Sequence, residues 1–327
     1  MTKQYRMLAF AVAAGVTLSF TSASVKAKDN WPDRPITLLV GFSPGGPTDN
    51  VARILATELS KQLKQNIIIE NKAGAAGNIA ATSLVKADPD GYTLLYNTSS
   101  IVITPWVYKS VSFDPLKDFA PVALTAAVPL VLATNTQLTA NSPQALIDQI
   151  KANPGKMNYA SSGTGAVEHL TAAQILSALD AKATHVPYKG TAPAQVDLIA
   201  GATQFTTTTL NTVIGPVNAG RMKALAVTSR ERSPVFPDVP TVAESLIPGF
   251  ESLAWQGIVA PAGTPERVIN RLNQAINAAL DSPEVQKRLL AEGTLSLGGS
   301  VAKYQTYIKD EYVRWGEVVK QAGAAVE

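Results

Sequence analysis

Few side chains in this sequence have the types and spacing that enzymes use for chemistry. The chain has no cysteine and two histidines, His169 and His185, which excludes thiolate chemistry and a histidine-rich metal site. It contains neither a Gly-x-Ser-x-Gly nucleophile turn nor a His-Glu-x-x-His zinc motif. A hydrolase would have to combine Asp49, His169 and a serine such as Ser162. We expect structural histidines, no catalytic residue, no metal and no cofactor, and we keep an exported hydrolase as an alternative.

A glycine-rich turn within Leu38–Asn50 indicates binding of an anion instead. The apolar run Ile36–Val40 predicts a buried strand, and apolar residues at helical spacing after Pro47 predict a helix. Gly45 and Gly46 allow the sharp turn between them, and backbone N–H groups at such a helix start attract a carboxylate or phosphate. The turn lacks the Gly-Lys-Ser/Thr of a phosphate-binding loop and the three spaced glycines of a dinucleotide fingerprint. A plain tight connection is the alternative.

Three side chains near the predicted turns have two possible roles each. With Gly46 as the N-cap, Asp49 stands at the third helical position, where its carboxylate can bond back to the N-cap N–H. Contact with a ligand is its other role. Lys189 could place a positive charge at a ligand or be an ordinary solvated lysine, and Phe42 could pack over a ligand or fill space.

The elements that must position these residues alternate between strand-like and helix-like segments, which predicts α/β layers. Small polar loops follow several of the strands, at Asn71–Asn78, Asn97–Ser100 and Ser161–Gly165. In open α/β sheets, ligands gather outside the carboxyl ends of the strands. A second lobe is expected to begin near Ala127 with a strand at Val128–Ala133, and the chain is expected to return to the first lobe through Trp255–Ala260.

The N-terminal segment has the pattern of a secretory signal peptide. Lys3 and Arg6 precede an apolar run at Met7–Phe20, and Val25-Lys26-Ala27 is a suitable exit, so we expect cleavage after Ala27 and a periplasmic location. These 27 residues hold three of the 28 basic side chains and none of the 25 acidic ones. The mature chain is therefore close to neutral, and the sequence gives no sign of nucleic-acid binding.

Five motifs together resemble the Bug family, the periplasmic receptors of tripartite tricarboxylate transporters. Their order and spacing match over essentially the whole mature chain, at Trp31–Ile36, Phe42–Asp49, Pro89–Leu95, Val186–Gly190 and Asp238–Ser245. The resemblance implies a type II periplasmic-binding-protein fold, with two α/β lobes joined by two crossover strands around a ligand cleft. We expect residues 28–126 and 255–327 in lobe 1 and residues 127–254 in lobe 2.

The resemblance also implies the ligand and its partners. The ligand would be a small mono- or dicarboxylate, passed by a monomeric receptor to the membrane permease subunits of the transporter. Two helix N-termini, one on each lobe, suit a ligand with two negative ends. A sensor that presents the same ligand to a signalling partner is an alternative, because it needs the same lobes. The expected ligand-binding residues are Phe42, Ser43, Pro44, Gly45, Gly46, Pro47, Asp49, Ala76, Ser99, Ser161, Ser162, Gly163, Thr164, Gly165, Lys189 and Thr208.

The sequence departs from the family's pattern at one strand. Acidic residues are usual around Gln204–Leu210, but Gln204 and Thr208 stand where aspartate is common. If Thr208 borders the cleft, loss of that carboxylate removes a partner for an amino group. We therefore expect an unsubstituted organic acid in preference to an amino acid.

Overall fold

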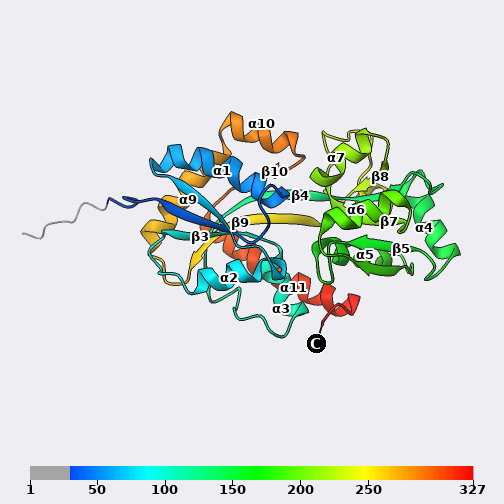
Figure 1. The fold of residues 1–327 in the computed structure, drawn as a ribbon, viewed down its shortest axis with the longest axis horizontal. Helices are drawn as coiled ribbons and strands as arrows, with labels where there is room; N and C mark the ends of the chain where they lie inside the picture. Colours follow the sequence, from blue (N-terminus) through cyan, green and yellow to red (C-terminus); the bar gives the residue numbers. More distant parts are fainter. Residues whose placement is uncertain (1–29, 327) are drawn as a thin grey trace, which may run out of the picture. The chain divides into compact units, whose positions relative to one another are not determined.

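The computed structural model describes residues 30–326, so the predicted signal peptide at 1–27 lies outside the described residues. Residues from Pro32 onward form one compact unit, which Figure 1 draws as a ribbon. The strands are β1 (Ile36–Val40), β2 (Ile67–Asn71), β3 (Thr93–Thr98), β4 (Phe119–Asn135), β5 (Asn158–Ser161), β6 (Thr184–Pro187), β7 (Phe205–Thr209), β8 (Met222–Val227), β9 (Leu253–Pro261) and β10 (Leu295–Ser296).

The helices connect and cover these strands. They are α1 (Pro47–Leu63), the short 3-10 turn η1 (Ala75–Gly77), α2 (Asn78–Val85), α3 (Ser100–Val107), α4 (Pro143–Ala152), α5 (Val167–Ala178), α6 (Thr191–Ala200), α7 (Leu210–Asn218), α8 (Val242–Ser245), α9 (Glu266–Leu280), α10 (Pro283–Ala291) and α11 (Val301–Ala322). Within residues 30–326, no helix has the length and apolar character needed to cross a membrane.

The first lobe is built on a mixed sheet. Strands β2, β1 and β3 run parallel, and β9 and β4 continue the sheet in antiparallel orientation. Strand β1 has the predicted bounds and is almost wholly buried, as expected for a strand covered on both faces. Helix α11 buries Tyr304 and Trp315 beside Trp255 of β9 in one apolar core. Its regularly spaced aromatic residues therefore mainly form a core face, as the sequence indicates.

Strand β4 passes from one lobe into the other. Its first part, Phe119–Pro129, pairs with β9 in the first sheet, and its last part, Leu130–Asn135, pairs with β7 and β8. The expected separate strand at Val128–Ala133 is thus the end of one 17-residue strand. No turn signal occurs at this point of the sequence, because the chain does not turn. Strand β9 returns alongside β4, as both strands show in the middle of Figure 1.

The second lobe repeats the α/β arrangement with its own core. Strand β5 lies parallel to β6 and β7, while β7 and β8 run antiparallel to β4. Tyr159, Phe205 and Leu146 pack in a core formed mainly by residues of this lobe. Two α/β lobes joined by β4 and β9 confirm the expected fold class. The lobe boundaries at 126/127 and 254/255 stay a prediction.

Candidate functional site

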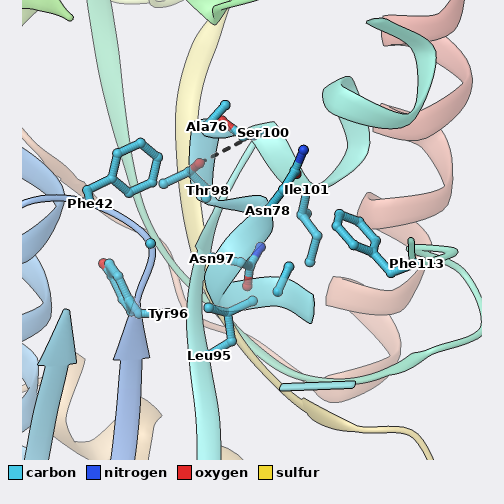
Figure 2. A pocket seen from close by; sticks show the side chains of 13 residues that line it. Phe42, Ala76, Asn78, Leu95, Tyr96, Asn97, Thr98, Ser100, Ile101 and Phe113 are labelled. Atoms are coloured by element: carbon cyan, nitrogen blue, oxygen red, sulfur yellow. Dashed lines mark hydrogen bonds between the residues drawn. The ribbon is translucent and has the colours of Figure 1, made fainter. Parts of the chain in front are cut away.

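A pocket opens in the first lobe at the carboxyl ends of β1 and β3, and Figure 2 shows its side chains. The pocket is open to solvent, and the empty space at it, open solvent included, is about 270 Å³. Its lining residues include no acidic or basic side chain: they are Gly41, Phe42, Ala76, Gly77, Asn78, Ala81, Leu95, Tyr96, Asn97, Thr98, Ser100, Ile101 and Phe113. The position agrees with the general rule for ligand sites in α/β sheets.

Two helix N-termini meet at this pocket. Gly77 and Asn78 begin α2, and Ser100 and Ile101 begin α3. The backbone before α2 has positive φ angles: φ is 54° at Ala76 and 93° at Gly77. Gly41 must lack a side chain because a Cβ there would lie 2.7 Å from the Gly77 Cα. The starts of both helices thus line one pocket, where the positive ends of their dipoles favour a negatively charged ligand. Two of the first N–H groups already have acceptors: Asn78 donates to the Ala75 carbonyl, and Ser100 donates to the Thr98 hydroxyl at 3.3 Å.

Asn97 adds an unpaired donor to the same pocket. Its side chain is 3% exposed, and its Oδ1 accepts a hydrogen bond from the Tyr304 hydroxyl at 3.0 Å. Its Nδ2 has no hydrogen-bond partner among the described residues. A buried amide N–H without a partner is costly, so a ligand oxygen or a water is expected there. Figure 2 shows Asn97 between Tyr96 and Thr98 on the wall of the pocket.

The glycine turn before α1 is held by the Asp49 carboxylate. The Asp49 carboxylate is fully buried and accepts from the Gly45 N–H at 2.8 Å, Arg53 Nε at 2.7 Å and Asn71 Nδ2 at 2.8 Å. Burial alone would raise the pKa of Asp49, but these hydrogen bonds outweigh it and lower that pKa. Asn71 Nδ2 also donates to the Phe42 carbonyl at 2.9 Å. Asp49 thus occupies the start of α1 and positions the loop that carries Phe42.

Asp49 thus has the local role considered for it, in which its carboxylate accepts a backbone N–H at the start of α1, with one difference. The carboxylate bonds to the Gly45 N–H and not to the N-cap, since the Gly46 N–H donates to the Ser43 carbonyl at 3.2 Å. Of the predicted residues Phe42–Pro47, only Phe42 lines the pocket. Ser43, Pro44, Gly45 and Pro47 are exposed. Their contact with ligand stays a prediction.

A second pocket lies in the second lobe, at the carboxyl ends of β5 and β7. The pocket is open to solvent, and the empty space at it, open solvent included, is about 260 Å³. The structure brings together the predicted residues Ser161, Ser162 and Thr208 there. The remaining lining residues are Glu168, Thr191, Ala194, Gln195, Leu198, Thr206 and Met222. Sequence analysis missed Glu168, although an acidic residue in the first turn of a helix after a small-residue loop is a recognisable signal.

The histidines hold the loop at this pocket. The His185 and His169 rings stack with centroids 3.7 Å apart. His185 Nε2 lies 2.6 Å from the Ser161 hydroxyl, and His169 Nδ1 accepts from the Gly165 N–H at 3.1 Å. Burial lowers the pKa of each imidazole to about 4, and the neighbouring His185 adds to this effect at His169. Both rings are therefore neutral near pH 7, which agrees with the structural role expected for them.

The three side chains of the hydrolase alternative make separate contacts. Ser162 donates to Glu168 at 2.9 Å, while His169 accepts from a backbone N–H and Asp49 is paired with Arg53 in the first lobe. A serine nucleophile needs its base within hydrogen-bond reach. This arrangement does not bring Ser162, His169 and Asp49 together as a triad.

Helix α3 joins the two predicted loops. Its first residues line the first-lobe pocket, and beyond its other end the Tyr108 hydroxyl donates to the Thr164 carbonyl at 3.1 Å. Gly165 faces Val107, since a Cβ at Gly165 would lie 2.7 Å from both Val107 methyl groups. An eight-residue helix is about 12 Å long. The first-lobe pocket and the Ser161–Gly165 loop are thus separated by roughly the length of one short helix.

Three other predicted ligand-binding residues differ in whether they line a pocket. Ala76 lines the first-lobe pocket, and Ser99 is buried as the N-cap of α3. Lys189 is exposed and lines neither of the two pockets. Among the described residues, no group of three or more His, Cys, Asp and Glu side chains could hold a metal ion.

Two α/β lobes with polar pockets at their strand ends define a ligand-binding protein of the type II periplasmic-binding-protein class. Residues 51–324 match the tripartite tricarboxylate transporter family receptor, TctC, and the chain belongs to this family. It is 37% identical over 320 residues to the protein BugT of Bordetella pertussis, covering 97% of this chain and 96% of BugT.

Solved structures of binding proteins are similar to this chain over most of its length. The Rpa4515 protein of R. palustris with adipate has a TM-score of 0.83 at 36% identity, covering 90% of this chain and 99% of that one. The periplasmic binding protein BugD has a TM-score of 0.80 at 35% identity, covering 91% and 100%. MatC from Rhodopseudomonas palustris with bound malate has a TM-score of 0.77 at 34% identity, covering 88% and 100%.

Gln204 and Thr208, which stand where aspartate is common in the family, have different surroundings in the structure. The Gln204 side chain accepts from the Asn158 N–H at 2.8 Å and supports the sheet. Thr208 lines the second-lobe pocket, but Glu168 lines it too. Thr208 provides no carboxylate, as expected from the sequence, but Glu168 of α5 adds a carboxyl group to the same pocket. The preference for an unsubstituted acid over an amino acid stays a prediction.

Proposed function

We propose that this chain is a receptor that captures a small carboxylate and passes it to the membrane permease subunits of a tripartite tricarboxylate transporter. The observation that carries the proposal is the first-lobe pocket. It combines two helix N-termini with the unpaired Asn97 amide and has no acidic side chain. Related receptors with adipate and with malate support an acid as the ligand.

The ligand carboxylate is proposed to lie against the starts of α2 and α3, with Phe42 and Ala76 beside it. Asn97 Nδ2 donates to one oxygen, and backbone N–H groups or bridging waters serve the others. The Ser161–Gly165 loop contributes from the second lobe. Relative movement of the lobes about β4 and β9 would close the site, as in other hinged binding proteins.

The remaining parts of the proposal concern the setting of the receptor. Export through a signal peptide cleaved after Ala27 would place the chain in the periplasm as a monomer. Residues 28–126 with 255–327 and residues 127–254 are proposed as its two lobes. The receptor performs no chemistry on its ligand, which is supported by the separate contacts of Ser162 and His169.

The test is a thermal-shift and calorimetric screen of small mono-, di- and amino carboxylates against the mature chain. A ligand at one hundred times its Kd stabilises the native state by about 2.7 kcal/mol, so it raises Tm. Asn97→Leu removes the donor with similar volume and should weaken binding about tenfold or more, since hydrogen bonds to charged groups contribute about 1.5–3 kcal/mol.

Asn153→Leu provides the matched control, because Asn153 is exposed at the end of α4, away from the lining of both pockets. It should bind ligand like the wild type. If no carboxylate shifts Tm, the receptor function is wrong. If Asn97→Leu binds as tightly as Asn153→Leu, the carboxylate does not lie in the first-lobe pocket.

A further inference from the structure

Glu168 places an uncompensated carboxyl group in the second-lobe pocket. The side chain is 8% exposed and accepts from the Ser162 hydroxyl at 2.9 Å. It takes part in none of the ion pairs found among the described residues. Burial raises the pKa of Glu168, opposed by hydrogen bonds from its own backbone N–H and from Ser162. A buried carboxyl group without a cation is costly in its charged form.

Three hydroxyl groups of this pocket, those of Ser162, Thr206 and Thr208, donate their protons to acceptors within the protein. Ser162 donates to Glu168, and Thr206 donates to the Ala160 carbonyl at 2.8 Å. Thr212 donates to the Thr209 carbonyl at 2.7 Å, so in its 3.2 Å contact with Thr208 the proton comes from Thr208. Each hydroxyl carries one proton, so Ser162, Thr206 and Thr208 have lone pairs left for a ligand.

Gln195 completes the same pattern. Its Nε2 donates to the Thr212 carbonyl at 2.8 Å, which leaves Oε1 as its acceptor. The second-lobe pocket thus presents several acceptors, whereas the first-lobe pocket presents the unpaired Asn97 Nδ2 donor. Glu168 is the one titratable group among the residues that line the second-lobe pocket. A second carboxylate there would face Glu168 and the lone pairs, and would be repelled.

We propose that Glu168 determines the specificity of the receptor, and that the second-lobe pocket takes the ammonium end of an amino carboxylate. An ammonium group has three N–H donors and a positive charge, which suit the Glu168 carboxylate and the neighbouring acceptors. The inference rests on the proposed function, because the carboxylate end of the ligand is assigned to the first-lobe pocket. The ligand is then a zwitterion that spans the two lobes once they have closed about β4 and β9.

The test compares ligands matched in length by titration calorimetry near pH 7.5. The pairs are γ-aminobutyrate with succinate, δ-aminovalerate with glutarate and ε-aminocaproate with adipate, with aspartate and glutamate added. We expect the best amino carboxylate to bind at least tenfold tighter than its dicarboxylate partner. Glu168→Gln keeps the shape and an acceptor for Ser162, and should reduce that preference at least tenfold. Glu317→Gln, on the exposed face of α11, should leave it unchanged.

Proton exchange provides a measurement on the wild-type chain. Titrations in two buffers of different ionisation enthalpy report protons released on binding. An arriving ammonium group stabilises ionised Glu168, so an amino carboxylate should release protons from the wild type but not from Glu168→Gln. Thr208→Val, which removes one acceptor, should weaken binding of the amino carboxylate more than that of the dicarboxylate, and it serves if Glu168→Gln fails to fold.

The outcomes distinguish failure of the inference about Glu168 from failure of the proposed receptor function. Tighter binding of dicarboxylates, with a ratio unchanged by Glu168→Gln, overturns the role of Glu168 and leaves the receptor function standing. Uptake of a proton with a dicarboxylate overturns it as well, because Glu168 would then act as a neutral acid. If no carboxylate of either kind binds, both proposals fall.

Discussion

Replacing Asp49 tests whether this residue stabilises the loop or contacts the ligand. Asp49→Asn keeps the size of the side chain but replaces one carboxylate oxygen with an NH₂ group. Oδ1 can still accept from Asn71, whereas the donors at Oδ2, the Gly45 N–H and Arg53 Nε, lose their acceptor. Hydrogen bonds to a charged group contribute about 1.5–3 kcal/mol each. Arg53 is half exposed and can turn to water, so we expect a loss of about 2–4 kcal/mol in the free energy of unfolding.

The effect should depend on pH in a defined direction. The folded-state pKa of Asp49 lies below its ordinary value of 3.8. Its charge therefore contributes stability that is present above the unfolded pKa and is lost as the pH falls through the folded pKa. The difference between Asp49→Asn and the wild type should be full near pH 7 and should shrink below about pH 4.

Urea denaturation at pH 7 and at pH 3, together with calorimetric affinity, gives the measurement. Asp148→Asn is the control, because this exposed carboxylate is hydrogen-bonded to Gln144 and its loss should change stability by no more than about 0.5 kcal/mol. Ligand affinity should fall only slightly in Asp49→Asn, through a looser Phe42 loop. Unchanged stability with abolished binding would refute the reasoning and make Asp49 a ligand contact.

Two further substitutions probe the second-lobe loop. Gly165→Ala should lower the free energy of unfolding by about 2–5 kcal/mol in denaturant titrations. The reason is that Gly165 has a φ of 76° and that a Cβ there would press on Val107. A change below about 1 kcal/mol would show that this contact can relax. In the wild type, His169 and His185 have folded pKa values of about 4, against an ordinary value of 6.5. Between these values the unfolded chain binds more protons than the folded chain, so the free energy of unfolding should fall as the pH drops from about 6.5 towards 4. His169→Gln should flatten this dependence in Tm measured across that range, and an equally steep curve would show that other groups cause it.

Local patterns in the sequence predicted much of the fold. The apolar run Ile36–Val40 and the aromatic spacing in α11 are visible because burial repeats with the period of the element. The small loops after strands likewise predicted where pockets lie, since the carboxyl ends of parallel strands share one edge. The α/β class could therefore be inferred before any contact was known, whereas the family and its two-lobe fold were implied by the resemblance of five motifs.

The details of the candidate site could not be inferred in this way. The glycine pair at Gly45–Gly46 has the strongest local signal for an anion, yet the Asp49 carboxylate already occupies that turn. The helix starts that line the first-lobe pocket are those of α2 and α3, whose short loops carry weaker signals. Occupation of a helix N-terminus depends on which side chain folds back onto it, and spacing alone does not decide that.

The sequence by itself determined the two α/β lobes, the order of their elements and the loops at the strand ends, because these follow from periodicities within a few residues. Tertiary structure decided the polarity of each pocket. Asn97 is held by Tyr304, 207 residues away along the chain, and Glu168 of α5 shares a pocket with Thr208 of β7. Whether a buried polar atom remains free for a ligand depends on all its neighbours in space, and those neighbours are brought together only by folding.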